Sequence, residues 1–319
     1  MQSTQYDIAR LTGLSQATIS RALRGDPSVV ADTRDRILAA CAELNYRPSI
    51  GGRLLAKGRR AMIGISLSRD ALPTDRYVTL LYQNLIQQLD NSGWGVTLLD
   101  AAELLDRLGT VGAVILIGVE DHDPRVAQCK AAMVPFVAIG YVSEPEVFSV
   151  IPDDADGARQ VVAHFHALGR KRLAIMSSYN HGHSPAIGRR AESAHAEAAR
   201  LGLSVVHLEA VRDVTNTLCG YRTAMRFRDN LPGIDCLFCE TDEHALGACS
   251  ALHDIGLRLP QDITVAGFDD LPGLSRHLTT VRQDFAEIAR STIILREEAI
   301  SGHPARQIVV PVQLIRRDT

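Results

Sequence analysis

Residues 7–21 read Asp7-Ile-Ala-Arg-Leu-Thr-Gly-Leu-Ser-Gln-Ala-Thr-Ile-Ser-Arg21, two short amphipathic stretches with a glycine between them. Gly13 suits the positive φ of a tight turn between helices, and Ser15 is a good N-cap for the second helix. The apolar residues expected to face inward are Ile8, Ala9 and Leu11 in the first stretch, and Ile19, Ala22 and Leu23 in the second. The pattern predicts a helix-turn-helix motif, a small all-α unit.

The second helix of such a motif enters the major groove of DNA. Gln16, Ala17 and Arg21 fall on its outward side, where they could read adenine, a thymine methyl group and guanine respectively. The side chains expected to contact phosphates are Ser15, Thr18, Ser20, Thr33 and Tyr46. The alternative is a helical hairpin whose arginines form an ordinary solvated face.

A third helical pattern spans 33–44 and is followed by Leu44-Asn-Tyr-Arg-Pro48. With these motifs the sequence resembles the LacI/GalR family of bacterial transcription regulators. The resemblance implies a DNA-binding head (1–47), a hinge helix (48–60) and an effector-binding and dimerisation domain (61–319). In that family the hinge inserts a leucine, here Leu55, into the minor groove at the centre of a palindromic operator, and the protein binds as a homodimer.

The distribution of charge agrees with a head that meets DNA. The whole chain of 319 residues has a formal net charge of −3, but residues 1–60 contain ten basic and five acidic residues, a balance of +5. The remainder contains 24 basic and 32 acidic residues, a balance of −8. A basic end on an acidic body is expected where one end binds a polyanion.

From residue 61 onwards short apolar runs alternate with amphipathic segments, which predicts an α/β fold with doubly wound parallel sheets. The predicted strands are 62–67, 96–99, 113–117, 136–139, 173–176, 205–208, 235–239, 263–268 and 308–312, and the predicted helices include 79–89, 157–168, 189–201, 220–229 and 242–255. The pattern leaves open whether there is one sheet or two. The resemblance implies two periplasmic-binding-protein-like subdomains, about 61–150 with 281–305 and about 151–280 with 306–319.

The resemblance also implies a small-molecule effector, a sugar or nucleoside, bound between the subdomains. The residues it places there are Arg76, Tyr77, Tyr141, Arg189, Thr241 and Asp269. Each has a structural alternative: Asp269 and Asp270 could cap the following turn, Arg189 could pair with Glu192, and Tyr77 could belong to the core. The segment between the strands 96–99 and 113–117 is short for the family and is similar to a subgroup of regulators near galactoside-utilisation genes, which implies a galactose-containing saccharide.

Several other classes of protein are not supported. The first thirty residues lack an apolar signal-peptide region, and no stretch of about eighteen apolar residues is present, so we expect a cytoplasmic protein with no membrane contact. Cys236 and Cys239 have metal-ligand spacing, but they lie in a predicted buried strand without further ligands, and we expect no metal or cofactor. We expect no enzymatic activity. The alternative is a sugar-binding or hydrolytic enzyme with cleft acids such as Asp269 and Asp270 as catalytic groups, which is disfavoured because adjacent residues on a strand point apart. An exported sugar-binding protein would explain the body but not the head.

Overall fold

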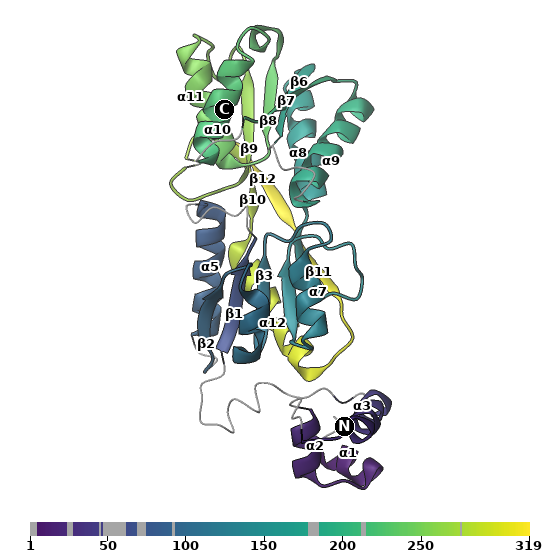
Figure 1. Cartoon of the computed structure of the whole chain (residues 1–319). Helices are drawn as coiled ribbons and strands as arrows, with labels where there is room; N and C mark the ends of the chain where they lie inside the picture. Colours follow the sequence, from purple (N-terminus) through teal and green to yellow (C-terminus); the bar gives the residue numbers. More distant parts are fainter. Residues whose placement is uncertain are drawn as a thin grey trace.

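A computed structural model of the chain describes residues 5–23, 28–44, 46, 62–68, 75–90, 93–177, 185–211, 215–274 and 276–319. The predicted hinge with Leu55 lies outside these residues. The described part contains a helical head and two α/β subdomains, whose sheets lie end to end in Figure 1.

The head consists of α1 (Gln5–Thr12), α2 (Gln16–Ala22) and α3 (Ala31–Glu43). Its small core contains Ile8, Ile19 and Ile37, all fully buried. Gly13 has φ +70°, and the Ser15 side chain accepts a hydrogen bond from the backbone N–H of Thr18, so the predicted turn and N-cap are confirmed. Leu11 is 46% exposed, and the prediction that it faces inward is wrong, because the narrow face that the short α1 buries is centred on Ile8.

The first subdomain is built on a parallel sheet of six strands. In spatial order these are β11 (Gln307–Val310), β5 (Ser149–Pro152), β4 (Phe136–Ile139), β3 (Ala113–Ile117), β1 (Met62–Leu67) and β2 (Gly95–Leu99). Helices α5 (Arg76–Leu89) and α12 (Phe285–Ser301) pack on one face. The other face is covered by α6 (Leu104–Arg107), the 3-10 turn η1 (Leu108–Thr110) and α7 (Pro124–Ala131).

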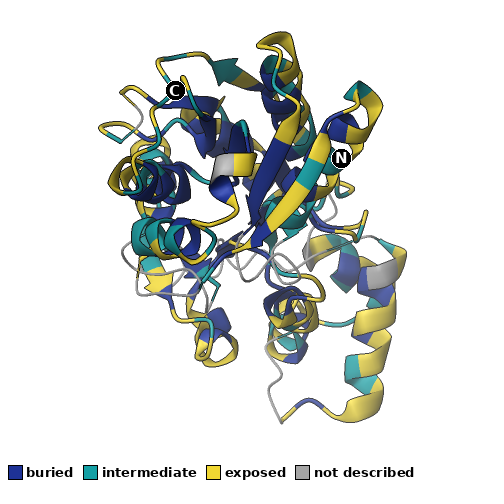
Figure 2. Cartoon of the chain, turned by 90° about the horizontal axis from the view of Figure 1, so that it is seen from above, coloured by how far each residue is buried: buried dark blue, intermediate teal, exposed yellow. Residues whose placement is uncertain are grey.

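The second subdomain repeats this plan. Its strands, in spatial order, are β12 (Val312–Ile315), β10 (Thr279–Gln283), β9 (Thr264–Asp269), β8 (Cys236–Cys239), β6 (Arg172–Ser177) and β7 (Ser204–Glu209). All are parallel except β12, which runs antiparallel to β10. The helices α8 (Asp154–Ala167) and α9 (Pro185–Leu201) cover one face, and α10 (Asn216–Arg226) and α11 (Asp242–Asp254) cover the other, with the 3-10 turn η2 (Leu231–Gly233) nearby. Figure 2 shows buried strands enclosed by helices whose outer faces are exposed.

The chain passes between the two sheets three times, after β5, after β10 and between β11 and β12. Two of the expected boundaries differ from this. The residues 281–283 belong to the second sheet, and the residues 307–310 pair with β5 in the first sheet. The apolar run 308–312 is therefore two strands, separated at Pro311, which has no N–H to donate to a ladder.

No helix in the described part of the chain is long and apolar enough to cross a lipid bilayer.

Candidate functional site

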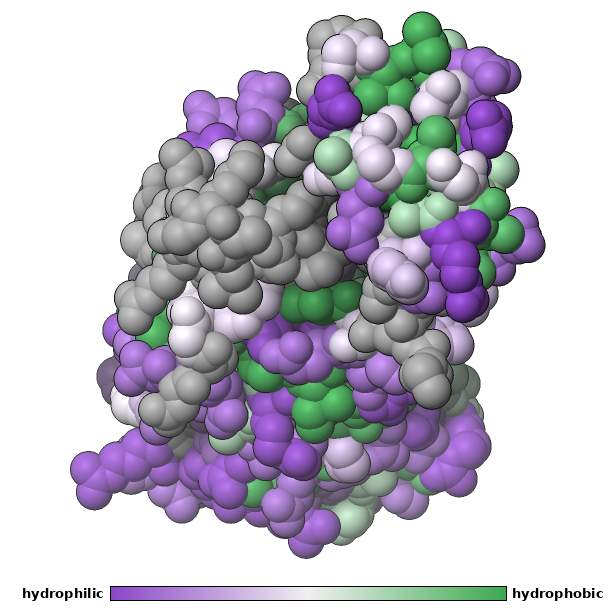
Figure 3. All heavy atoms as spheres, turned by 90° about the horizontal axis from the view of Figure 1, so that it is seen from below, coloured by the Kyte–Doolittle hydropathy of each residue, from purple (hydrophilic) through white to green (hydrophobic). Residues whose placement is uncertain are grey.

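The exposed face of α2 carries the three residues predicted to read bases. Gln16, Ala17 and Arg21 are all exposed, whereas Ile19 and Ala22 on the opposite side are buried. The Arg21 Nε donates to the carbonyl oxygen of Ala17 at 3.4 Å, which lays the guanidinium along this face. Seen from below, the described surface mixes hydrophobic side chains with hydrophilic ones (Figure 3). The structure therefore brings the three residues together on one accessible side of a helix.

The predicted phosphate contacts surround this helix but differ in accessibility. Ser15 is exposed, and Thr18, Ser20, Thr33 and Tyr46 are half-buried. The hydroxyl groups of Ser15 and Thr18 lie 2.9 Å apart and share a hydrogen bond. Both groups lie at the N-terminus of α2, where backbone N–H groups and the helix dipole favour an anion.

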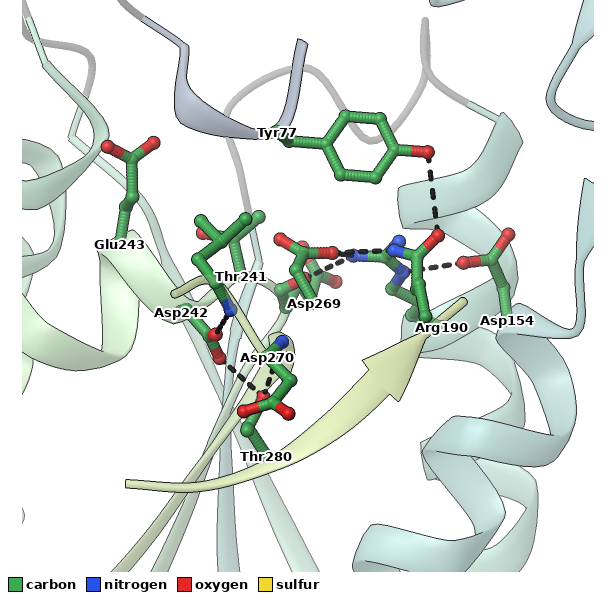
Figure 4. Close-up of polar contacts among 12 residues, drawn as sticks. Tyr77, Asp154, Arg190, Thr241, Asp242, Glu243, Asp269, Asp270 and Thr280 are labelled. Atoms are coloured by element: carbon green, nitrogen blue, oxygen red, sulfur yellow. Dashed lines mark hydrogen bonds and ion pairs between the residues drawn. The ribbon is translucent and has the colours of Figure 1, made fainter. Parts of the chain in front are cut away.

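A buried polar network lies where the second sheet faces the first subdomain. Asp269, the last residue of β9, is 3% exposed and has φ +118°. Its Oδ1 accepts hydrogen bonds from Gln283 Nε2 at 2.7 Å and from Arg190 Nη1 at 3.4 Å. The Arg190 Nε donates to Asp154 Oδ1 at 2.7 Å. The Arg190 guanidinium of α9 thus lies between Asp154 of α8 and Asp269 of β9 (Figure 4), and Gln283 of β10 joins the network through Asp269.

The first subdomain contributes Tyr77 to the same place. Its hydroxyl donates to Gln283 Oε1 at 3.4 Å, and its ring packs edge-on against Phe285, with centroids 5.3 Å apart. Figure 4 shows the ring on the opposite side of the junction from Arg190 and Asp269. Tyr77 therefore both touches the apolar core of its own subdomain and reaches across. We call Tyr77, Asp154, Arg190, Asp269 and Gln283 the inter-subdomain site.

Asp242 holds the strained turn that follows β9. Its Oδ2 accepts from the backbone N–H of Leu271 at 2.7 Å, and its Oδ1 accepts from the Thr280 hydroxyl. Gly267 makes this approach possible, because a Cβ there would lie 2.4 Å from the Asp242 Oδ1. The turn fixes Asp269 in a backbone conformation that side-chain-bearing residues rarely adopt.

The carboxyl groups of the site compete for one counter-charge. Burial raises the pKa of Asp269 well above its ordinary value of 3.8, Arg190 opposes this shift, and the carboxylates of Asp242 and Asp75 add to it. Burial also raises the pKa of Asp154 against the opposing effect of Arg190. Burial disfavours the charged form of Arg190 too, but Asp154 and Asp269 outweigh it and raise its pKa. Arg190 is therefore charged, and it stabilises two carboxylates only in part.

The other predicted effector residues do not take part in this hydrogen-bond network, although Thr241 lies close to Asp269 (Figure 4). Thr241 is the N-cap of α11, where its hydroxyl accepts from the His244 N–H at 3.2 Å. Arg76 is exposed at the first residue of α5. Arg189 does not join the network: its guanidinium lies over the Tyr141 ring, 4.4 Å from the centroid. Both line a separate pocket of about 930 Å³ between α9 and the first subdomain, together with Asp121, Glu192 and His195.

Three members of the site were missed by the sequence: Arg190, Asp154 and Gln283. Arg189 and Arg190 are adjacent, and a step of one residue turns a helical side chain by about 100°. To choose between them, one must know which face of α9 is turned toward the sheet, and this is set by the packing of α9 against α8. The available signal was only an arginine pair near the start of a helix.

Within the described residues, no group of three or more His, Cys, Asp or Glu side chains could hold a metal ion. Cys236 and Cys239 are both buried in β8.

Two protein families match different parts of the chain, one the helical head and the other the α/β body. The lacI family of bacterial regulatory proteins matches residues 4–49, and the periplasmic binding protein-like domain matches residues 162–319. The HTH-type transcriptional regulator MalR of Streptomyces coelicolor is 30% identical over 100% of this chain and 97% of its own length. The lactose operon repressor of Escherichia coli is 26% identical over 99% of this chain and 90% of its own length.

A solved structure shows the same arrangement of head and subdomains. The lac repressor dimer bound to operator and the anti-inducer ONPF has a TM-score of 0.73 and 26% identity, over 100% of this chain and 99% of that one. The helix-turn-helix head, the two-sheet body and the similarity over the full length all point to one family. The chain belongs to the LacI family of DNA-binding transcription regulators.

Proposed function

We propose that the protein is a repressor that binds a palindromic operator as a homodimer and is controlled by a saccharide held in the inter-subdomain site. The observation that carries the DNA-binding part is the exposed face of α2 with Gln16, Ala17 and Arg21. In the proposal, Leu55 of the hinge is the wedge in the minor groove. The protein would act in the cytoplasm, where the chromosomal DNA lies.

The effector assignment rests on the chemistry of the inter-subdomain site. A guanidinium and two carboxyl groups, with an aromatic ring opposite, suit the hydroxyl groups and apolar face of a sugar. The Oδ2 of Asp154 is buried and has no hydrogen-bond partner among the described residues, so an acceptor is available to a ligand hydroxyl. We propose a galactose-containing saccharide, which is supported by the short crossover at 104–110 and by the similarity to the lactose operon repressor.

The coupling between the two sites follows from the fold. Tyr77 and Gln283 join the subdomains across the site, so a ligand that binds one arrangement of the subdomains better than another shifts their equilibrium. The change in operator affinity can be no larger than that difference in ligand affinity. We propose a regulatory and not a catalytic role, which is supported by the similarity to the transcriptional regulator MalR and to the lactose operon repressor.

The DNA-binding proposal is tested by selecting operators from random-sequence duplexes with the full-length protein. We expect a palindromic consensus. Arg21→Ala should relax the preference at one base position in each half-site and weaken binding by about 1–3 kcal/mol. Arg10→Ala, which removes an exposed arginine from α1, is the matched control and should leave the base preference intact. An unchanged preference in Arg21→Ala would remove this residue from the base-reading set.

The wedge is tested separately. Leu55→Ala should weaken operator binding while largely sparing non-specific DNA, because unstacking a base step matters only where the operator is bent. Equal losses on both kinds of DNA would contradict the wedge. Adding saccharides to the wild-type complex tests the effector, and a change in operator affinity in either direction supports it.

A further inference from the structure

We infer that the inter-subdomain site selects saccharides without negative charge and rejects acidic ones such as uronic acids and sugar phosphates. The inference rests on the proposed saccharide effector and names its chemical class. It is carried by the excess of buried carboxyl groups over buried cations at the junction between the subdomains.

Carboxyl groups outnumber the buried cation at this junction. Asp154, Asp242 and Asp269 are each at most 3% exposed, and Glu243, at the start of α11, is 8% exposed. Among the described residues at the junction, Arg190 is the buried cation that faces them, at 5% exposure; the less buried Arg189 and Arg76 also act, on Asp154 and on Glu243 respectively. An anionic ligand would therefore enter a region that holds more carboxyl groups than arginines, and its charge would further oppose their ionisation.

The Arg190 guanidinium already forms hydrogen bonds and ion pairs within the protein. Beyond its hydrogen bonds to the two aspartates, its Nη1 donates to the carbonyl oxygen of Glu240 at 2.6 Å. Its guanidinium lies over the Phe268 ring, 3.7 Å from the centroid. A ligand carboxylate or phosphate would have to compete with Asp154 and Asp269 for this group, and their displacement would leave buried charges unpaired.

Among the five residues of the inter-subdomain site, the unsatisfied buried atom is an acceptor, whereas the unpartnered donor Arg189 Nε belongs to the guanidinium that lies over the Tyr141 ring in the separate pocket. The Oδ2 of Asp154 is buried without a hydrogen-bond partner among the described residues, and Figure 4 shows this carboxyl group beside Arg190. A hydroxyl or an ammonium group can donate to such an oxygen. A carboxylate or phosphate cannot donate, and it meets like charge at low dielectric.

A second acidic pair lies at the other end of the junction, with one member from each subdomain. Glu243 Oε2 accepts a hydrogen bond from Asn216 Nδ2 at 3.1 Å, and the negative charge of Asp75 raises the pKa of the Glu243 carboxyl group. Asp75 caps α5 by accepting from the Tyr77 N–H at 2.9 Å. Burial raises the pKa of both Glu243 and Asp75; Asp75 adds to the shift of Glu243, while the hydrogen bond from Asn216 and the charge of Arg76 oppose it only in part. The same sign of charge is thus present on both sides of the site.

The test compares sugars that differ only in charge, using the full-length protein at pH 7. The probes are galactose, galactosamine, galacturonic acid and galactose 6-phosphate, followed by lactose and its acidic derivative lactobionic acid. Binding is measured by calorimetry and by the shift of the unfolding temperature. We expect the neutral and amino sugars to bind at least about tenfold more tightly than the acids, the scale of one unscreened like-charge contact.

The two proposals fail differently in this experiment. If an acidic sugar binds as tightly as its neutral counterpart, the charge selection is wrong while the saccharide effector stands. If no sugar of any charge binds, the saccharide effector is wrong and the selection falls with it. Galactosamine binding alone would support the selection and narrow the ligand to amino sugars.

A variant locates the source of the selection. Glu243→Gln keeps the size of the side chain and removes one negative charge, so galacturonic acid should gain about threefold or more in affinity while galactose changes less. Glu43→Gln removes the same charge from an exposed position in α3 and serves as the control. An equal effect of the two substitutions, or no gain in Glu243→Gln, would contradict the role of Glu243.

Discussion

The two sheets of this protein each bury an arginine at their carboxyl edge, and the two arginines are used differently. Arg125 of the first subdomain is 3% exposed and donates to the backbone carbonyls of Ser66, Ile117 and Gly118 at 2.9 to 3.2 Å. It also forms a forked ion pair with Asp123, two residues earlier in the chain. Arg190 of the second subdomain is buried to the same degree, but its carboxylate partners come from two distant segments.

The difference separates a structural ion pair from a binding site. Burial alone would raise the pKa of Asp123, but its hydrogen bonds from Arg125 and from backbone N–H groups outweigh burial and lower it. Burial raises the pKa of Asp269 beyond what Arg190 can offset. A buried pair that satisfies itself holds the ends of β1 and β3 together. A buried guanidinium shared by two carboxyl groups, one with an unpartnered oxygen, leaves bonds for a ligand.

The largest expected effect is the loss of the self-contained pair. Arg125→Ala should lower the free energy of unfolding by about 3–5 kcal/mol, because it leaves Asp123 as a buried charge without its partner. Three backbone carbonyls also lose a donor. Urea unfolding measures this, and Lys130→Ala is the control on the same helix. Lys130 forms an ion pair with Glu144 in which both side chains are more than 40% exposed, so its loss should cost no more than about 1 kcal/mol.

Arg190→Ala should cost less stability, about 1–3 kcal/mol, because Asp154 and Asp269 already have raised pKa values and can take up protons. Its main effect should be on function, with the operator response to the effector lost while DNA binding without effector remains. Arg189→Ala is the matched control on the neighbouring residue and should retain the response. A loss of response in Arg189→Ala with a normal response in Arg190→Ala would reverse the assignment.

The two regions should also respond to pH with opposite sign. The lowered pKa of Asp123 means that the native state binds fewer protons than the unfolded state, so this stabilisation is full above pH 3.8 and is lost as pH falls through the native pKa. The raised pKa of Asp269 means that the native state binds more protons. Stability should therefore fall as pH rises from about 3.8 through the native pKa, by at most about 1.4 kcal/mol per pH unit for one group.

Unfolding experiments between pH 4 and 8 measure this slope. Asp269→Asn removes the titrating group and should make stability less dependent on pH over this range than in the wild type. Asp229→Asn, at a side chain that is 92% exposed, should leave the slope unchanged. A steeper slope in Asp269→Asn would show that the native carboxyl group has a lowered pKa.

The sequence predicted most strands but missed β5 and β10, of which β10 supplies Gln283 to the site. The strands β1, β3 and β4 were predicted from runs of apolar residues, because parallel strands are buried on both faces. β10 has the sequence Thr-Thr-Val-Arg-Gln and was not predicted. Its buried residues Thr280 and Gln283 donate hydrogen bonds to Asp242 and Asp269 respectively. Because these polar side chains are satisfied inside the protein, a search for apolar runs does not find the strand.

The same reason limits what the sequence could say of the site. Asp269 was predicted through its family motif and lies in the network, as does Tyr77. Asp154 lies 36 residues before Arg190, and nothing local marks it as the partner. Partners that come from distant segments are brought together only by the tertiary fold, whereas the Arg125 pair is formed by residues two positions apart.

The smallest expected effect concerns the bond that joins the two regions. Burial raises the pKa of the Tyr77 phenol, so its hydroxyl remains protonated and donates to Gln283, at a long 3.4 Å. Tyr77→Phe removes this bond and keeps the ring contact with Phe285, so stability should fall by no more than about 1 kcal/mol. The populations of the subdomain arrangements can change by at most about fivefold, and effector affinity should change within the same factor.

Tyr77→Ala is the contrasting variant, because it also removes the ring from the first subdomain's core. A loss in Tyr77→Phe as large as that in Tyr77→Ala would mean that the hydroxyl, and not the ring, dominates the contact between the subdomains. A small effect of Tyr77→Phe beside a lost effector response in Arg190→Ala would instead place the control of the response in the second subdomain. In that case the first subdomain supplies a surface that closes on the ligand, while the unsatisfied groups around Arg190 recognise it.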